Sequence, residues 1–320
     1  MWDWSPVLAI RNLPAPMSAT PPALEDRRNF AIGVLVAAQL FFTILDTCAK
    51  WLAVSGFHTF EIVFVRYGVH VALLLALVLP VRGLAVFRTG AWHLELIRAL
   101  CLLGVTFSNF FAMRFLPLTV TGALLFTMPL MICLLAVPML GEKVGWHRGL
   151  AVLVGFVGIL IIVRPGTEAF HPAALLALLG AFFGALYSIL TRRLAGIDPA
   201  TTQTVYGGLI ALVLVTPFAF AEWRWPSDLP TWIAFFGAGV GGMLAHQLSA
   251  VAHRYAPPTV LAPFSYLELL GLAVASWIVF SEPPDAWFYA GAPIIILSGI
   301  YIWFRERRLA RAGMRMGVED

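Results

Sequence analysis

Apolar runs long enough to cross a membrane follow one another along almost the whole chain. A spanning helix needs about 20 mostly apolar residues. Reading the breaks at Gly, Pro and charge clusters predicts ten spans, at 30–54, 58–80, 92–114, 117–140, 146–164, 171–192, 201–221, 230–252, 258–280 and 286–304. Only helices fit, because an open sheet edge in lipid would leave backbone groups unpaired. The sequence therefore predicts an all-α integral membrane protein.

Composition excludes the main soluble classes. The chain is 60% hydrophobic and 12% charged, whereas soluble domains carry about 25% charged residues. The net charge of +4 does not indicate a nucleic-acid partner, because the basic residues occur in twos and threes between apolar runs. Cys48, Cys101 and Cys133 lie inside apolar runs and have no disulfide or metal-ligand spacing. We expect no metal and no cofactor.

The orientation follows from the Lys and Arg residues of the short loops. With a cytoplasmic N-terminus, the outer segments hold only Arg114, Arg164 and Arg224. The fifteen basic residues of the inner segments are Arg11, Arg27, Arg28, Arg82, Arg88, Lys143, Arg148, Arg192, Arg193, Arg254, Arg305, Arg307, Arg308, Arg311 and Arg315. This asymmetry predicts that both termini are cytoplasmic.

The chain repeats itself at a shift of 140 residues. The stretch "RFLPLTV" at 114–120 falls on "RYAPPTV" at 254–260, Trp92 falls on Trp232 and Glu142 on Glu282. Each half then has five helices, and because five is odd, the second half enters the membrane from the opposite side. Inverted repeats of this kind are typical of secondary transporters that alternate access around a midplane site.

The segment 114–166 resembles the repeat signature of the EamA family in the drug/metabolite transporter superfamily. The features that carry the resemblance are Leu116-Pro117-Leu118, Thr127-Met128-Pro129, Leu140-Gly141-Glu142 and Arg164-Pro165-Gly166. The second copy departs from it, with Ser281-Glu282 in place of Gly-Glu and no Arg-Pro-Gly at 304–306. The resemblance covers about 30–305 and implies a ten-helix inner-membrane transporter, in most members an exporter of amino acids and related metabolites. It also implies a path lined by the first, third, fourth, sixth, eighth and ninth helices.

These boundaries predict four parts. A cytoplasmic lead at 1–29 is expected to be disordered, and Met1 and Met17 are both open as its start. The first repeat is 30–166, the second is 167–305, and a basic cytoplasmic tail is 306–320.

Polar residues inside spans are rare and face the interior of a helix bundle, so they are the candidates for a substrate or proton site. In the first span, Gln39, Asp46 and Lys50 share one helical stripe. Arg66 in the second span lies at nearly the depth of Asp46, so an Asp46–Arg66 contact competes with an internal Asp46–Lys50 pair. Structural pairing and substrate binding both remain open for these residues.

Further candidates are Asn109 in the third span, Tyr187 in the sixth, and His246 with Gln247 in the eighth. Each alone could equally serve as an interhelical hydrogen bond. Pro129 and Pro263 are hinge candidates because they would interrupt the fourth and ninth spans, which correspond in the two halves. Arg98 with Glu95 is interpreted as a boundary anchor.

Glu268 is the only charged residue between Pro258 and Phe280. It is about ten residues from the cytoplasmic edge of its predicted span, or roughly 15 Å, which is the middle of the membrane. We expect it to bind a proton or a substrate amine; a hydrogen-bonded glutamate that only holds helices together is the alternative.

No nucleotide-binding loop and no catalytic constellation is visible, so we expect no enzyme. The sequence predicts a secondary transporter in a bacterial inner membrane, whose partners are the lipid bilayer and a small-molecule substrate such as an amino acid. Export is favoured over import, and coupling to protons is open. Alternatives are an importer, a carrier of nucleoside-like or cationic compounds, or a scaffold or sensor without transport. A monomer and a homodimer are both open.

Overall fold

The computed structural model describes residues 28–128, 130–132, 134–135, 146–167, 170–194, 197–221, 223–255, 261 and 264–316. Its elements are α2 (Arg28–Val54), α3 (Thr59–Arg82), η2 (Gly83–Phe87), α4 (Trp92–Ala112), α5 (Leu118–Leu125), α7 (Trp146–Val163), α8 (Ala173–Leu194), α9 (Ala200–Ala219), α10 (Leu229–Tyr255), α12 (Leu267–Phe280) and α13 (Ala286–Met316). Within these ranges no residue is in a β-strand.

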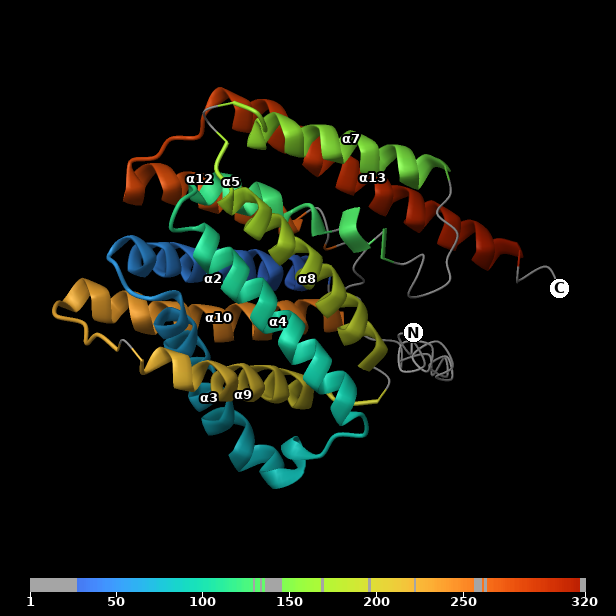
Figure 1. Ribbon diagram of the computed structural model, residues 1–320. Helices are drawn as coiled ribbons and strands as arrows, with labels where there is room; N and C mark the ends of the chain where they lie inside the picture. Colours follow the sequence, from blue (N-terminus) through green and yellow to red (C-terminus); the bar gives the residue numbers. More distant parts are fainter. Residues whose placement is uncertain are drawn as a thin grey trace, which may run out of the picture.

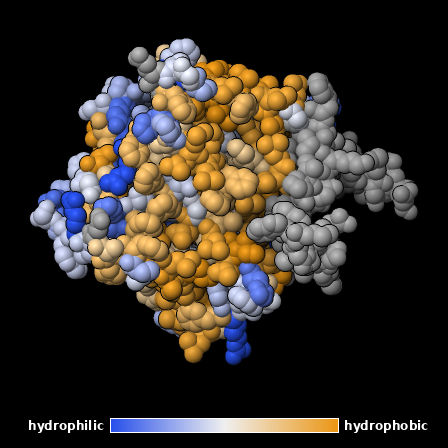
Figure 2. Space-filling model, in the orientation of Figure 1, coloured by the Kyte–Doolittle hydropathy of each residue, from blue (hydrophilic) through white to orange (hydrophobic). Residues whose placement is uncertain are grey.

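The helices match the all-α membrane class that the sequence predicts. Six of them are long and apolar enough to cross a membrane: those in α2, α3, α4, α8, α9 and α10. Shorter apolar helical stretches of 10–17 residues lie at the other four predicted positions, in α5, α7, α12 and α13. Large apolar side chains such as Leu77, Val213 and Ile278 are exposed, and Figure 2 shows a mainly hydrophobic face. The outer surface therefore suits lipid.

An aspartate caps the N-terminus of α10, and another caps that of α13. The Asp228 carboxylate accepts a hydrogen bond from the Thr231 backbone N–H at 2.8 Å, and Asp285 does the same for Phe288 at 2.8 Å. Such N-caps pair backbone N–H groups that have no partner within the helix. The bonds from Thr231 hold the pKa of Asp228 below its ordinary value.

The packing of helices is symmetric between the two halves of the chain (Figure 1). Helix α2 packs on α10 and α4 on α8, α10 packs on α3 and α4 on α9, and α12 packs on α2 and α5 on α8. In chain order, the equivalent helices are α2 and α8, α3 and α9, α4 and α10, α5 and α12, and α7 and α13. Exchanging each helix for its equivalent converts the first contact of each pair above into the second. The same exchange converts the α3–α9, α5–α12 and α7–α13 contacts into themselves. The halves are therefore related by an approximate two-fold axis.

Two glycines permit the closest crossing at this axis. A Cβ atom on Gly158 of α7 would lie 3.0 Å from the carbonyl oxygen of Gly291 in α13, and one on Gly291 would lie 2.7 Å from the Gly158 oxygen. Small residues let transmembrane backbones approach in this way. Helices α7 and α13, the pair at the top of Figure 1, approach each other closely at these two glycines.

Helices α5 and α12 are interrupted at equivalent positions. Helix α5 ends at Leu125 and is followed by a turn at Phe126 and Thr127, and α12 begins after a turn at Tyr266. Phe126 and Tyr266 are related by the 140-residue shift. The predicted hinge residues Pro129 and Pro263 lie outside the described residues. The sequence predicts interruptions in the fourth and ninth spans, and the break at Tyr266 places Glu268 in the first turn of α12.

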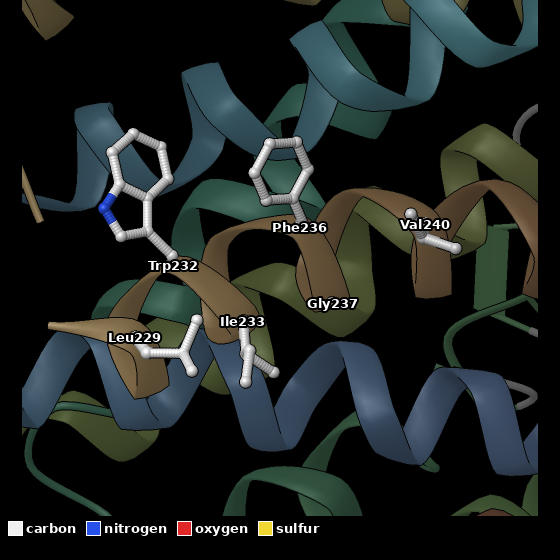
Figure 3. Close-up of a pocket in the computed structure, with 6 residues that line it drawn as sticks. All are labelled: Leu229, Trp232, Ile233, Phe236, Gly237 and Val240. Atoms are coloured by element: carbon white, nitrogen blue, oxygen red, sulfur yellow. The ribbon is translucent and has the colours of Figure 1, made fainter.

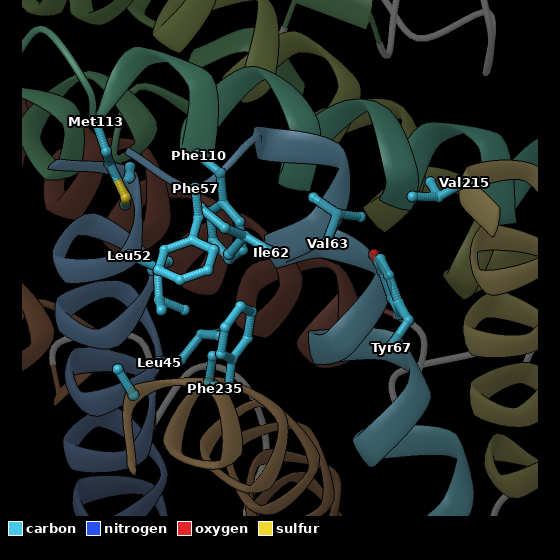
Figure 4. Packing of buried hydrophobic residues seen from close by; sticks show 14 of the residues in the cluster. Leu45, Leu52, Phe57, Ile62, Val63, Tyr67, Phe110, Met113, Val215 and Phe235 are labelled. Atoms are coloured by element: carbon cyan, nitrogen blue, oxygen red, sulfur yellow. The ribbon is translucent and has the colours of Figure 1, made fainter. Parts of the chain in front are cut away.

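The largest buried apolar cluster closes one end of the bundle. It joins Leu52 and Phe57 to Ile62, Met113 and Phe235, where α2 and α4 end and α3 and α10 begin (Figure 4). We call this the far end. The opposite end, where α2 begins and α13 finishes, is called the terminal end.

Candidate functional site

A cavity of about 600 Å³ lies between the two halves. Its walls come from α2, α3, α4, α5, α8, α10 and α13, from the turn that leads into α12 and from the first turn of α12. These include every helix of the path that the family resemblance implies, with α3 and α13 in addition. Its polar lining residues are Gln39, Asp46, Arg66, Thr106, Asn109, Tyr187, Ser188, His246, Ser249, Ser265, Tyr266 and Glu268. Pockets of roughly 300–1,000 Å³ are typical of small-molecule sites.

Most of the residues that sequence reasoning selected meet in this cavity. Seven of them line it: Gln39, Asp46, Arg66, Asn109, Tyr187, His246 and Glu268. Lys50 and Gln247 do not. The cavity lies toward the middle of the bundle, because its lining residues include Asp46 near the middle of α2, Asn109 of α4 and Gly299 near the middle of α13.

The carboxyl groups of Asp46 and Glu268 belong to one electrostatic system. Asp46 is 6% exposed, and its charge acts on Glu268. Glu268 lies in the first turn of α12, where unpaired backbone N–H groups and the helix dipole favour a negative charge. Like charges in one cavity repel, so a proton or a cation between these groups would relieve the repulsion.

Arg66 is held in the cavity wall without an ion pair to any described residue. Its Nη2 lies 3.4 Å from Nε2 of His246, and its guanidinium lies 4.3 Å above the ring of Tyr67. No ion pair within 4.0 Å joins it to Asp46, although both residues are described, so the predicted Asp46–Arg66 contact is at most a longer-range attraction. The Nε and Nη1 atoms of Arg66 have no hydrogen-bond partner in the described part of the chain.

Lys50 pairs with a carboxylate from the other half. Its ammonium group donates to Glu282 and to the carbonyl oxygen of Leu116, the latter at 3.2 Å, and it lies 4.9 Å from the ring centroid of Phe280. The predicted internal Asp46–Lys50 pair is therefore wrong. The physical reason is that the end of α12 brings Glu282 over the last turns of α2, beyond the depth of Asp46. Lys50 therefore joins α2 to the residues after α12 at the far end, and it does not line the cavity.

Arg98 is deeply buried and is not the boundary anchor that the sequence suggested. It is 3% exposed and donates to the Thr191 hydroxyl at 2.7 Å, to the Tyr187 hydroxyl at 2.8 Å and to the Gln203 carbonyl at 2.7 Å. Glu95 lies 3.6 Å away and is also buried. These bonds tie α4 to α8 and α9 and hold the Tyr187 ring in the cavity wall.

Sequence reasoning missed Glu61 altogether. This residue is fully buried in the first turn of α3 and accepts a hydrogen bond from the Arg224 backbone N–H at 3.0 Å. The available signal for its burial was a carboxylate just inside the predicted span at 58–80. Such a residue looks the same in the sequence as a solvated residue at an ordinary helix end. The bond ties α3 to the loop before α10.

A second hollow lies on the outer face of α10 and has a different character. Its lining residues are Leu229, Trp232, Ile233, Phe236, Gly237 and Val240 (Figure 3). Ile233 and Phe236 are exposed, and none of the six carries a charge. The hollow has the chemistry of a lipid-facing surface, whereas the polar groups gather in the central cavity. No cluster of three or more His, Cys, Asp or Glu side chains able to hold a metal occurs in the described ranges.

Comparisons with known proteins agree with this architecture. The model of the EamA-like transporter family matches twice, at 29–164 and 171–304. A solved crystal structure superposes with a TM-score of 0.62 at 19% identity, covering 88% of this chain and 99% of the other. This likeness supports the fold alone.

The chain aligns with curated relatives over nearly their whole length. A riboflavin transporter of Vibrio cholerae is 31% identical over 87% of this chain and 94% of the relative. An S-adenosylmethionine uptake transporter of Rickettsia felis is 28% identical over 87% and 93%, and a pseudopaline exporter of Pseudomonas aeruginosa is 27% identical over 84% and 94%. All three are named as transporters, which confirms the prediction that the chain is not an enzyme.

Proposed function

The chain belongs to the EamA-like transporter family, and from this premise we propose that it is a secondary transporter for a polar metabolite with a planar heteroaromatic ring. It is a multi-pass membrane protein that moves a small molecule, as its relatives do. The observation that carries the finer proposal is the central cavity, which combines polar groups with the aromatic rings of Phe126, Tyr187 and Tyr266.

The relatives favour this substrate class over an amino acid. Riboflavin and S-adenosylmethionine, which two relatives are named for, both carry a flat ring system with hydrogen-bonding edges. Aromatic walls suit such a ring, because aromatic faces stack at centroid distances of 4.5–7 Å. Amide side chains at Gln39 and Asn109 offer donors and acceptors to its edge. This is the nucleoside-like alternative of the sequence prediction.

Export of an amino-acid-like metabolite is the second candidate. One relative is named as an exporter, and the cavity contains both an arginine and carboxyl groups. The direction of transport is therefore a separate question from the substrate class, and the same assay in both orientations addresses it.

We propose alternating access by two inverted five-helix repeats, at 30–166 and 167–305, with ten spans and both termini in the cytoplasm. The symmetric helix contacts and the basic inner loops support this. The far end is packed by the apolar cluster around Leu52 and Phe57 and held together by the ion pair of Lys50 and Glu282. This arrangement suits an inward-facing state in a bacterial inner membrane. Asp46 and Glu268 are the proposed proton or cation site, with Arg66, His246, Gln39, Asn109 and Tyr187 as substrate contacts.

Flux through purified protein tests the proposal. Proteoliposomes preloaded with unlabelled riboflavin or S-adenosylmethionine would be given the labelled compound, and counterflow would be compared with empty liposomes. We expect saturable accumulation of at least one of the two ring-bearing compounds. Flux of amino acids alone would favour the second candidate. No flux of any compound in a broad metabolite panel would instead support a scaffold or sensor.

A further inference from the structure

The guanidinium group of Arg66 lies in the wall of the central cavity and has unsatisfied donors. The side chain is 3% exposed, lines the cavity, and has two nitrogen atoms, Nε and Nη1, without a hydrogen-bond partner among the described residues. A buried charged donor without an acceptor is unfavourable, more so than a neutral one. An acceptor that the protein does not supply is therefore expected at this point.

The surroundings of Arg66 orient the group without neutralising it. Its contacts are the His246 ring at 3.4 Å and the faces of Tyr67 and Phe110, whose centroids lie 4.3 and 6.0 Å from the guanidinium carbon. Asp46 attracts it but forms no direct ion pair. A planar guanidinium fixed in this way suits a carboxylate, because its N–H groups match the two oxygen atoms.

The same cavity presents a separate negative pole. Asp46 and Glu268 both line it, their charges act on one another, and neither forms an ion pair with a described Lys or Arg. A cationic centre between them would be stabilised by both carboxylates. A proton would satisfy this pole alone, whereas the donors of Arg66 would remain unpaired. A ligand that satisfies both Arg66 and the two carboxyl groups therefore needs a negative and a positive charge.

We propose that the cavity recognises a dipolar head group, which carries a carboxylate and a cationic centre on one end of the substrate. Arg66 binds the carboxylate, and Asp46 with Glu268 binds the cationic centre. The free Oδ1 of Asn109 and Oε1 of Gln39, both on buried side chains of the cavity wall, accept N–H groups of the same ligand. This assignment deepens the proposed function and rests on the cavity being the transport site.

Three probes that share one adenosine ring separate the two poles. S-adenosylhomocysteine carries a carboxylate and an ammonium group, its decarboxylated amine carries only the ammonium group, and 5′-methylthioadenosine carries neither. Dissociation constants would be measured by calorimetry on the purified full chain in lipid nanodiscs. For the wild type we expect affinity to fall by about tenfold or more at each step of this series, which is typical for the loss of one charge-assisted contact.

Variants assign each step to its side chain. Arg66→Gln should remove the advantage of S-adenosylhomocysteine over the amine and leave the advantage of the amine over 5′-methylthioadenosine. The double variant Asp46→Asn, Glu268→Gln should do the reverse. Arg66→Lys keeps the charge and should retain part of the first step. Arg164→Gln, which changes an arginine paired with Asp285 outside the cavity, is the matched control and should match the wild type in all three constants.

The outcomes separate this inference from the proposed function. Equal binding of the three probes, no binding of any of them, or an equal loss for all three in Arg66→Gln would overturn the dipolar assignment. Elution volume and melting temperature without ligand identify a variant that has simply misfolded, and Arg66→Lys then carries the test. Riboflavin flux together with equal binding of the probes would leave transport standing, whereas charge-ordered binding without any flux would leave only the head-group assignment.

Discussion

The rings of Phe126 and Tyr266 pack against each other with their centroids 5.2 Å apart and their planes at 34°. They occupy equivalent positions in the two repeats, and each lies at the break of its helix, after α5 and before α12. Both also line the central cavity. The approximate two-fold axis therefore passes close to this pair, where the two interrupted helices meet.

Replacing Phe126 with Ala should slow transport more than it lowers stability. The change removes an aromatic contact of about 0.5–1.5 kcal/mol beyond its buried area and enlarges the cavity where the repeats meet. We expect a fall of roughly tenfold in transport rate, which corresponds to about 1.4 kcal/mol, and a small decrease in melting temperature. Tyr266→Phe keeps the ring and should retain the wild-type rate. Equal losses in both variants would indicate that the tyrosine hydroxyl, not ring packing, is responsible.

Glu268→Gln should abolish transport or its dependence on pH while the protein still folds. The amide keeps the size of the carboxyl group and can form hydrogen bonds, but it cannot bind and release a proton. Initial rates of flux would be measured between pH 5.5 and 8.5, beside the melting temperature of each sample. Asp285→Asn is the matched control, because that carboxylate lies outside the cavity and pairs with Arg164. If the Glu268→Gln variant transported at the wild-type rate at every pH, the proposed role of Glu268 would be contradicted.

Removing the carboxylate of Glu282 should destabilise the protein more than removing both charges. Glu282→Gln leaves the ammonium group of Lys50, which is 2% exposed, without its anionic partner, and breaking a buried pair costs about 3–5 kcal/mol. Glu282 is itself partly exposed, so we expect a loss at the lower end of that range. In the double variant Lys50→Met, Glu282→Gln neither charge of this pair remains. Its melting temperature should lie above that of Glu282→Gln; a lower value would contradict the pairing.

Arg98→Lys should be strongly destabilising although it conserves the charge. The guanidinium donates to three acceptors on two other helices, and the single nitrogen of a lysine cannot reach them all in that fork. We expect a loss of about 2–4 kcal/mol, from one or two charge-assisted bonds at about 1.5–3 kcal/mol each.

Tyr187→Phe provides the milder comparison for Arg98. It removes only one of the three acceptors and keeps the ring in the cavity wall, so the loss should be about 1–3 kcal/mol. Thermal unfolding in one detergent, with both variants side by side, measures the order of the two effects. A Tyr187→Phe variant less stable than Arg98→Lys would contradict the role given to the guanidinium fork.

The sequence by itself determined the class of protein and most of the cavity-lining candidates. Lipid offers no partners to backbone polar groups, so long apolar runs have to become helices, and a buried polar side chain in such a run has to face the protein interior. These are local arguments, and they were sufficient to select seven residues that the fold brings together, Asp46, Arg66 and Glu268 among them. The repeat likewise follows from comparing the chain with itself.

Only the tertiary structure decided which charged groups meet. Lys50 is four residues from Asp46 on one helix, yet it pairs with Glu282, which is 232 residues away. Helical spacing tells which side chains share a face, but it carries no information about what the neighbouring helix presents at that depth. The position of Glu268 at the start of α12 and the burial of Arg98 depend in the same way on where two helices break and cross. Those distances arise when the two halves pack, because ion pairing in a membrane interior is decided by contacts between elements far apart in the chain.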